Sequence, residues 1–177
     1  MTEHEIYYAS FYGSTRAYAD ALAQQLGCTA QEIGGVAPAA AGGPILVLAP
    51  MHGPSNAGVS FIKELPAEVL EARPVCLATV GMTLDHVVQE KDPAASLLGS
   101  RAGQVHRFYL PGRLNYSELS TGHTGIMRGI VSALRLKPGK SENDRMMIDT
   151  YGKDTDRVDL ERLAPIVQWA RDAATGS

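Results

Sequence analysis

Hydroxyl side chains and a glycine are concentrated in one short stretch, Ser10-Phe11-Tyr12-Gly13-Ser14-Thr15. An apolar run precedes it and a segment with helical spacing follows, so its hydroxyls and the N–H groups of a helix N-terminus face one point. The helix dipole adds about half a positive charge there, so a phosphate dianion can be bound largely without Lys or Arg. The stretch therefore predicts a phosphate-binding loop formed by Ser10, Tyr12, Gly13, Ser14 and Thr15.

This loop differs from two common nucleotide-binding sequences. It has neither the lysine of a Walker A sequence nor the three glycines of a dinucleotide fingerprint, which disfavours nucleoside triphosphates and NAD. A second interpretation stays open, in which Ser14 and Thr15 merely cap a helix. The position after the first predicted strand favours ligand binding, because open α/β sheets bind ligands beside the point where the strand order reverses.

The elements that must position this loop follow from hydrophobic spacing. Short apolar runs indicate buried strands at residues 6–9, 45–49, 75–80 and 105–110. A weaker strand over residues 28–33 fits a sheet edge. Helices are predicted from Gly13 or Ser14 to 26, and at 58–65, 93–101 and 159–173. This alternation predicts an α/β fold, a doubly wound five-stranded parallel sheet in the order 2-1-3-4-5.

About forty residues between the fifth strand and the last helix exceed what such a sheet needs, which predicts an insertion over about 113–150. Apolar residues from Ile126 to Leu134 recur with helical spacing, whereas residues 136–144 are predicted to form a loop. Six basic and three acidic side chains between Arg113 and Arg145 give this part a charge of +3 and leave −6 elsewhere. It is either the solvated face of an amphipathic helix or a docking surface for an acidic partner, a membrane surface or a carboxylate-bearing substrate.

Length and composition limit the remaining choices. The 177 residues have ordinary globular composition and predict a single domain over 1–177, and the formal net charge of −3 gives no general reason to bind nucleic acid. Cys28 and Cys76 lack CxxC spacing and are interpreted as small buried residues in a reducing compartment. The scattered histidines predict no metal site. The start lacks the pattern of a signal peptide and no apolar run approaches about 20 residues, so a cytoplasmic location is expected.

The phosphate loop and the order of the elements together resemble the flavodoxin family. Its loop pattern, Thr/Ser-x-x-Gly-x-Thr, is matched by Ser10, Gly13 and Thr15. The sequence Pro111-Gly112-Arg113-Leu114-Asn115-Tyr116 and the late insertion are similar to the menaquinone-dependent protoporphyrinogen dehydrogenase branch of flavodoxin-like proteins. The resemblance implies a flavodoxin-like fold, FMN as the cofactor and electron transfer as the activity.

The resemblance also implies that two later loops, residues 50–55 and 79–83, enclose the isoalloxazine ring. Their expected ring-facing residues are Pro50, Met51, His52, Gly53, Thr79, Val80, Gly81 and Met82. Many flavodoxins stack Trp and Tyr on the flavin, and these loops contain neither, which leaves ring affinity and redox potential open. His52 either hydrogen-bonds the flavin or faces solvent.

Two activities remain as alternatives. One is an FMN-dependent oxidoreductase whose redox partner is a quinone- or porphyrin-type small molecule, with no residue assigned as acid or base. The other is a one-electron carrier that acts with a redox partner protein. The sequence also leaves open a fold that binds no flavin, a peripheral contact with a membrane, and a homodimer.

Overall fold

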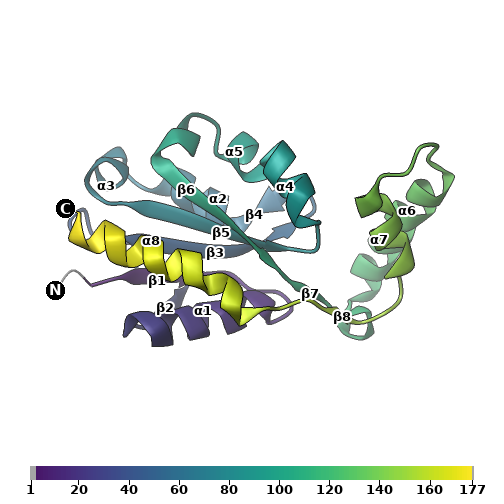
Figure 1. Ribbon diagram of the computed structural model, residues 1–177, viewed down its shortest axis with the longest axis horizontal. Coiled ribbons are helices and arrows are strands. Elements are labelled where there is room, and N and C mark those ends of the chain that lie inside the picture. Colours follow the sequence, from purple (N-terminus) through teal and green to yellow (C-terminus); the bar gives the residue numbers. More distant parts are fainter. Residues whose placement is uncertain (1–2, 177) are drawn as a thin grey trace.

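The computed structural model describes residues 3–176 as a parallel β-sheet between two layers of helices (Figure 1). The strand order is β2-β1-β3-β5-β6, with parallel pairing throughout that path. These strands are β1 (Glu5–Tyr8), β2 (Ala30–Glu32), β3 (Ile45–His52), β5 (Val75–Gly81) and β6 (Val105–Pro111). The predicted α/β class and the order 2-1-3-4-5 are confirmed. A two-residue strand that was not predicted, β4 (Ser55–Asn56), pairs antiparallel with the end of β3.

Side-chain alternation along the strands explains why both faces of the sheet are covered. Leu46 packs with α1 (Ser14–Leu26) and α8 (Ala164–Thr175) on one face. Its neighbour Val47 packs on the other face with α2 (Ala57–Glu64), α3 (Ala67–Ala72) and α5 (Pro93–Leu98). Successive residues of a strand point to opposite faces, so a strand buried on both sides reads as the continuous apolar run seen in the sequence.

Several predicted helix boundaries are wrong, for identifiable reasons. The helix α3 is too short to show a periodic stripe, and α4 (Asp85–Lys91) has no buried residue to mark one, so neither was predicted. The helix predicted over 93–101 ends at Leu98 and continues as a 3-10 helix, Gly99–Gln104. The last helix begins at Ala164, after the 3-10 turn Leu160–Leu163, with Pro165 in its first turn.

The edge strand is shorter than predicted, and this affects the first cysteine. Because β2 begins at Ala30, Cys28 lies before it and is half-buried, which corrects the expectation that both cysteines are buried. Cys76, in the central strand β5, is buried as expected. Both thiols are free, and burial raises the pKa of each.

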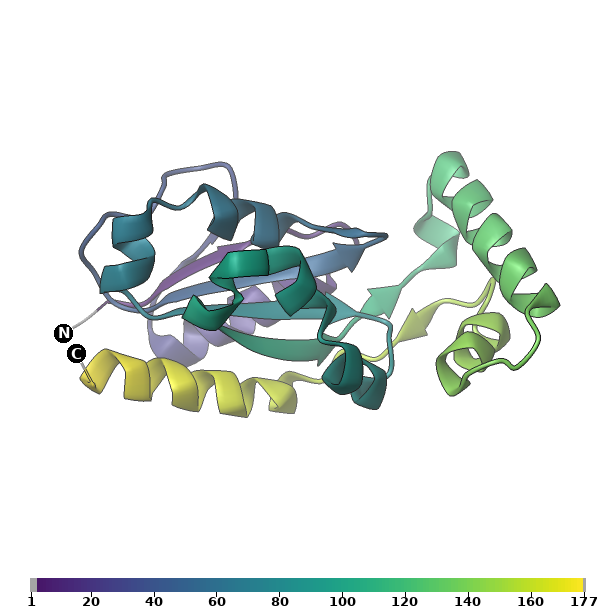
Figure 2. The ribbon, with the colours of Figure 1, turned by 90° about the horizontal axis from the view of Figure 1, so that it is seen from above.

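Beyond β6 the chain leaves the sheet and forms an arm, residues 113–156. The chain leaves on β7 (Arg113–Leu114), passes a 3-10 turn (Tyr116–Glu118), forms α6 (Thr121–Leu136) and α7 (Glu142–Asp149), and returns on β8 (Thr155–Asp156). The strands β7 and β8 pair antiparallel as a narrow ribbon, and Figure 2 shows both arm helices lying beyond the ends of the sheet strands.

The bounds predicted for the loop over 136–144 are wrong at both ends. Leu136 is the last residue of α6, and α7 begins at Glu142. A capping box starts α7, in which the Ser141 hydroxyl accepts from Asp144 N while the Asp144 carboxylate accepts from Ser141 N. The Ser-x-x-Asp sequence at residues 141–144 indicates a helix start. The Pro138-Gly139 pair just before it favours a loop, which is why the sequence predicted one.

One tyrosine contacts both chain segments at the base of the arm. The Tyr18 hydroxyl, on α1, donates to Pro111 O at 2.6 Å and accepts from Asp159 N at 2.9 Å. It therefore holds the points where the chain leaves and rejoins the sheet layer. Within residues 3–176, none of the helices combines the length and apolar character that crossing a bilayer requires.

Candidate functional site

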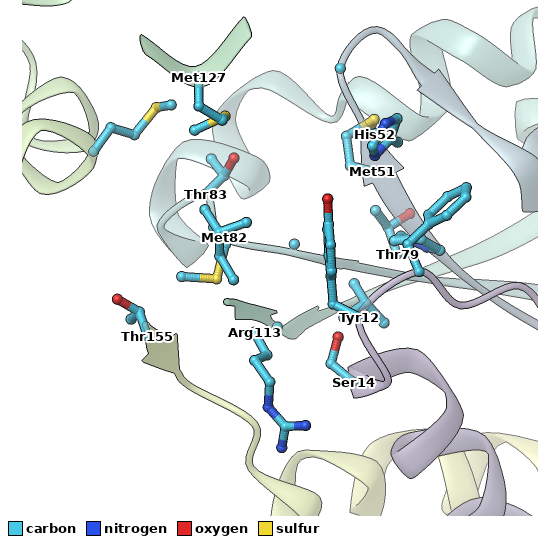
Figure 3. A pocket seen from close by; sticks show the side chains of 18 of the residues that line it. Tyr12, Ser14, Met51, His52, Thr79, Met82, Thr83, Arg113, Met127 and Thr155 are labelled. Atoms are coloured by element: carbon cyan, nitrogen blue, oxygen red, sulfur yellow. The ribbon is translucent and has the colours of Figure 1, made fainter. Parts of the chain in front are cut away.

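A cavity of about 630 Å³ lies between the carboxyl ends of β1, β3 and β5 and the arm (Figure 3). This volume is typical of a small-molecule site. Most of the predicted site residues line the cavity: Tyr12, Ser14, Thr15, Pro50, Met51, His52, Gly53, Thr79, Val80, Gly81 and Met82. The predicted residues Ser10 and Gly13 lie in the same loop but are not part of the lining.

The start of α1 forms one end of the cavity and has unsatisfied hydrogen-bonding groups. Gly13 is its N-cap residue, with a left-handed φ of +81° and no capping side chain, so the first N–H groups of the helix have no intrahelical acceptor. Thr15 is 1% exposed, and its Oγ1 has no hydrogen-bond partner among residues 3–176. A buried hydroxyl without a partner is costly, so a ligand with acceptor oxygens would fit this end.

Ser10 is oriented differently from the other loop hydroxyls. Its Oγ accepts from Arg16 N at 3.4 Å, so the side chain turns back onto the first turn of α1. It therefore supports the shape of the loop in this arrangement, while Ser14 and Thr15 border the cavity.

The loop after β5 is held by hydrogen bonds to its backbone. The Tyr109 hydroxyl donates to Thr83 O at 2.8 Å, and Arg157 Nη1 donates to Met82 O at 3.1 Å. Burial raises the pKa of Tyr109, so its hydroxyl stays protonated and able to donate. A Cβ on Gly81 would lie 2.9 Å from Tyr109 Oη, so glycine is required for the loop to approach this ring so closely.

The loop after β3 is anchored through its neighbour Asn56. Asn56 Oδ1 accepts from Gly58 N and Val59 N and so caps α2, while its Nδ2 donates to Thr79 Oγ1 at 3.2 Å. This buried residue joins the two predicted ring-side loops. Its hydrogen bond to Thr79 ties the residue that follows the β3 loop to the end of β5.

Contacts remote in sequence orient His52. Its ring lies 4.8 Å from the Phe11 ring and 4.9 Å from the His123 ring, between centroids. His123 Nδ1 in turn lies 3.3 Å from the Tyr12 hydroxyl, and burial raises the pKa of Tyr12. The arm therefore meets both the phosphate loop and the β3 loop through His123, a residue for which the sequence indicated no site role.

Other cavity residues that the sequence did not single out come mainly from the arm. All five methionines within residues 3–176 line the cavity, Met51 and Met82 from the core and Met127, Met146 and Met147 from the arm. Tyr109 and Tyr116 supply the aromatic rings that the two predicted loops lack. Tyr116 belongs to the segment 111–116 that resembles the protoporphyrinogen dehydrogenase branch, so the sequence could have indicated it. No local pattern marks Met146 or Met147.

This arrangement can hold a phosphorylated, largely apolar ligand. The phosphate fits the start of α1, where buried hydroxyls and N–H groups converge, and an aromatic ring fits between the loops after β3 and β5. Methionine side chains suit such a ring because they are flexible and make favourable contacts with aromatic groups. Thr15 and Ser14 would hold the phosphate of FMN, and Met51, Thr79 and Met82 would flank its ring.

One comparison with known proteins bears on this site. A family model described as Flavodoxin domain matches residues 5–141, which is most of the chain and includes the whole of α6. A search of curated proteins finds no match.

Proposed function

The chain belongs to the flavodoxin domain family, and on that premise we propose that it binds FMN at the cavity and acts as an FMN-dependent oxidoreductase. The observation that carries the proposal is Thr15 Oγ1, a buried hydroxyl with no partner among residues 3–176, at a helix N-terminus whose N-cap residue, Gly13, has no capping side chain. A phosphate would satisfy this hydroxyl and the adjacent N–H groups together. The proposed contacts are Tyr12, Ser14 and Thr15 to the phosphate end and Met51, His52, Thr79 and Met82 to the ring.

The arm supports an enzyme that takes a small redox substrate. The cavity continues past the ring-side loops to Met127 and Met147, so its volume includes apolar space on the arm side. FMN, when bound, supplies the transfer of electrons and protons. The residues of the chain orient the ring, exclude water through the apolar walls and shape a place for the second reactant. A quinone- or porphyrin-type molecule suits that apolar space, in agreement with the resemblance to protoporphyrinogen dehydrogenases.

The cofactor proposal is tested by a visible spectrum of the purified protein with mass analysis of the released chromophore. We expect a flavin spectrum and the mass of FMN, or uptake of added FMN at micromolar concentration. Thr15→Val keeps the shape of the side chain but removes its hydroxyl, and we expect about a ten-fold weaker affinity for FMN from the loss of one charge-assisted hydrogen bond. Thr175→Val, near the end of α8, is the matched control. A protein that takes up no FMN would refute the proposal.

A one-electron carrier remains the second candidate, and the exposed surface of α6 favours it. Arg128 and Arg135, seven residues apart, are exposed on this helix, which would suit an acidic protein partner. Steady turnover of a porphyrinogen with a quinone supports the enzyme. Exchange of electrons with a carrier protein without turnover of either small molecule supports the carrier.

A further inference from the structure

The phosphate loop has no cation of its own, although the ligand proposed for it is a dianion. Residues 10–15 include no Lys or Arg. The next residue, Arg16, has its side chain about two-thirds exposed and lies 3.8 Å from Asp20, one turn along α1. A side-chain cation that adds to the helix dipole at this end of the cavity would therefore come from elsewhere in the chain.

Arg113 brings a guanidinium to the loop from the base of the arm. Its Nη1 lies 3.9 Å from the position that a Cβ on Gly13 would occupy, and the residue lines the cavity. Figure 3 shows the side chain of Arg113 extending toward the start of α1, on the side where Ser14 is labelled. Arg113 and Gly13 are one hundred positions apart in sequence, so no local pattern could pair them.

Asp156 fixes the direction of this guanidinium. Asp156 Oδ2 accepts from Arg113 Nε at 2.9 Å and lies 2.7 Å from Arg113 Nη2, across the β7–β8 ribbon in which the two residues are direct partners. This contact lowers the pKa of Asp156, so its carboxylate remains charged at neutral pH. These two contacts involve Nε and Nη2 and leave Nη1 out.

We propose that Arg113 is a phosphate-binding residue, with Nη1 donating to the anion that the start of α1 and Thr15 Oγ1 also hold. This inference rests on the proposed function for the identity of the ligand, FMN. Asp156 acts as the positioning residue, since it occupies two nitrogens of the guanidinium and leaves the third facing the loop. One consequence is a link between ligand and arm, because the phosphate would join the first residue of β7 to the first turn of α1.

The test compares FMN with riboflavin, which has the same ring but no phosphate. In Arg113→Gln we expect the affinity for FMN to fall about ten-fold, the usual effect of losing a hydrogen bond to a charged group, and the affinity for riboflavin to stay unchanged. Arg113→Lys should retain part of the preference for FMN because the charge remains. Arg171→Gln, which removes the same charge from an exposed position on α8, should change neither affinity. The ratio of the two affinities is measured by quenching of flavin fluorescence.

The outcomes separate this inference from the proposed function. An unchanged ratio in Arg113→Gln, or an equal loss for both flavins, would overturn the role of Arg113 while FMN binding stands. If the wild-type protein takes up no flavin, the proposed function fails. The role of Arg113 is then tested separately, by measuring Tm with inorganic phosphate. A rise of Tm with phosphate that is lost in Arg113→Gln would then support the role, and no rise, or an equal rise in both proteins, would overturn it.

Discussion

The sheet core and the arm form opposite walls of one cavity, but they are stabilised in different ways. Central strand residues such as Leu46 and Leu77 are completely buried, whereas Thr121–Leu136 buries Val131 and Glu142–Asp149 buries Asp144. Buried apolar area is the main source of stability, so the core wall is fixed by packing. The arm wall depends on a few contacts of polar groups.

Those contacts lie around the rim of the cavity. Asn143 Oδ1 accepts from Leu84 N at 3.1 Å, and the side chains of His86 and Glu142 lie 3.5 Å apart. Exposed pairs of this kind contribute little stability. The comparison therefore teaches that the core side of the cavity, where we propose that the cofactor binds, is preorganised, while the arm side can adjust at low energetic cost.

The largest effect should come from removing buried volume in the core. Leu77→Ala, at a fully buried position of β5, should lower the free energy of unfolding by about 2–5 kcal/mol. Leu136→Ala, at a side chain that is 86% exposed at the end of α6, should change it by less than about 0.5 kcal/mol. Urea unfolding followed by circular dichroism measures both. Similar values for the two variants would contradict the division between a packed core and a lightly held arm.

A smaller effect is expected where the core lines the proposed site of the flavin ring. Gly81→Ala places a Cβ 2.9 Å from Tyr109 Oη, and relieving this overlap should cost about 1–3 kcal/mol and shift the loop after β5. FMN and riboflavin should both bind more weakly, since the ring rather than the phosphate is affected. Combining it with Tyr109→Phe removes the overlapping oxygen and should restore part of the binding. If FMN alone were weakened, the loop would not lie against the ring.

The smallest effect concerns the arm and depends on pH. The Lys137 ammonium and the Ser141 N–H lower the pKa of Asp144 to about 2, from an ordinary value of 3.8. A lowered pKa in the folded state means that the stabilisation is fully present above pH 3.8 and is lost as the pH falls through 2. We expect amide signals of α7 to lose their helical shifts in this window before those of β5 change, and Asp144→Asn should remove the dependence. Simultaneous changes in both elements would show that the arm does not open separately.

Much of the core could be predicted from the sequence because its signals are local. The apolar runs that became β3 and β5 are buried on both faces, and Gly13 followed by two hydroxyl residues marked the start of α1. The helices α3 and α4 escaped prediction since one is very short and the other has no buried stripe. The capping box at Ser141 is a local signal for the start of α7.

The sequence by itself determined the α/β class and the position of the loop that we propose binds phosphate, because strand burial and helix starts depend on neighbours along the chain. The strand order followed from the alternation of strands and helices, which is typical of a doubly wound sheet. Only the tertiary structure decided what faces that loop. Arg113, His123 and the methionines of the arm line the cavity because the chain leaves the sheet on β7, forms the arm and returns on β8. Contacts of that kind depend on where a segment distant in sequence lies in the fold. The spacing of residues along the sequence does not indicate that position.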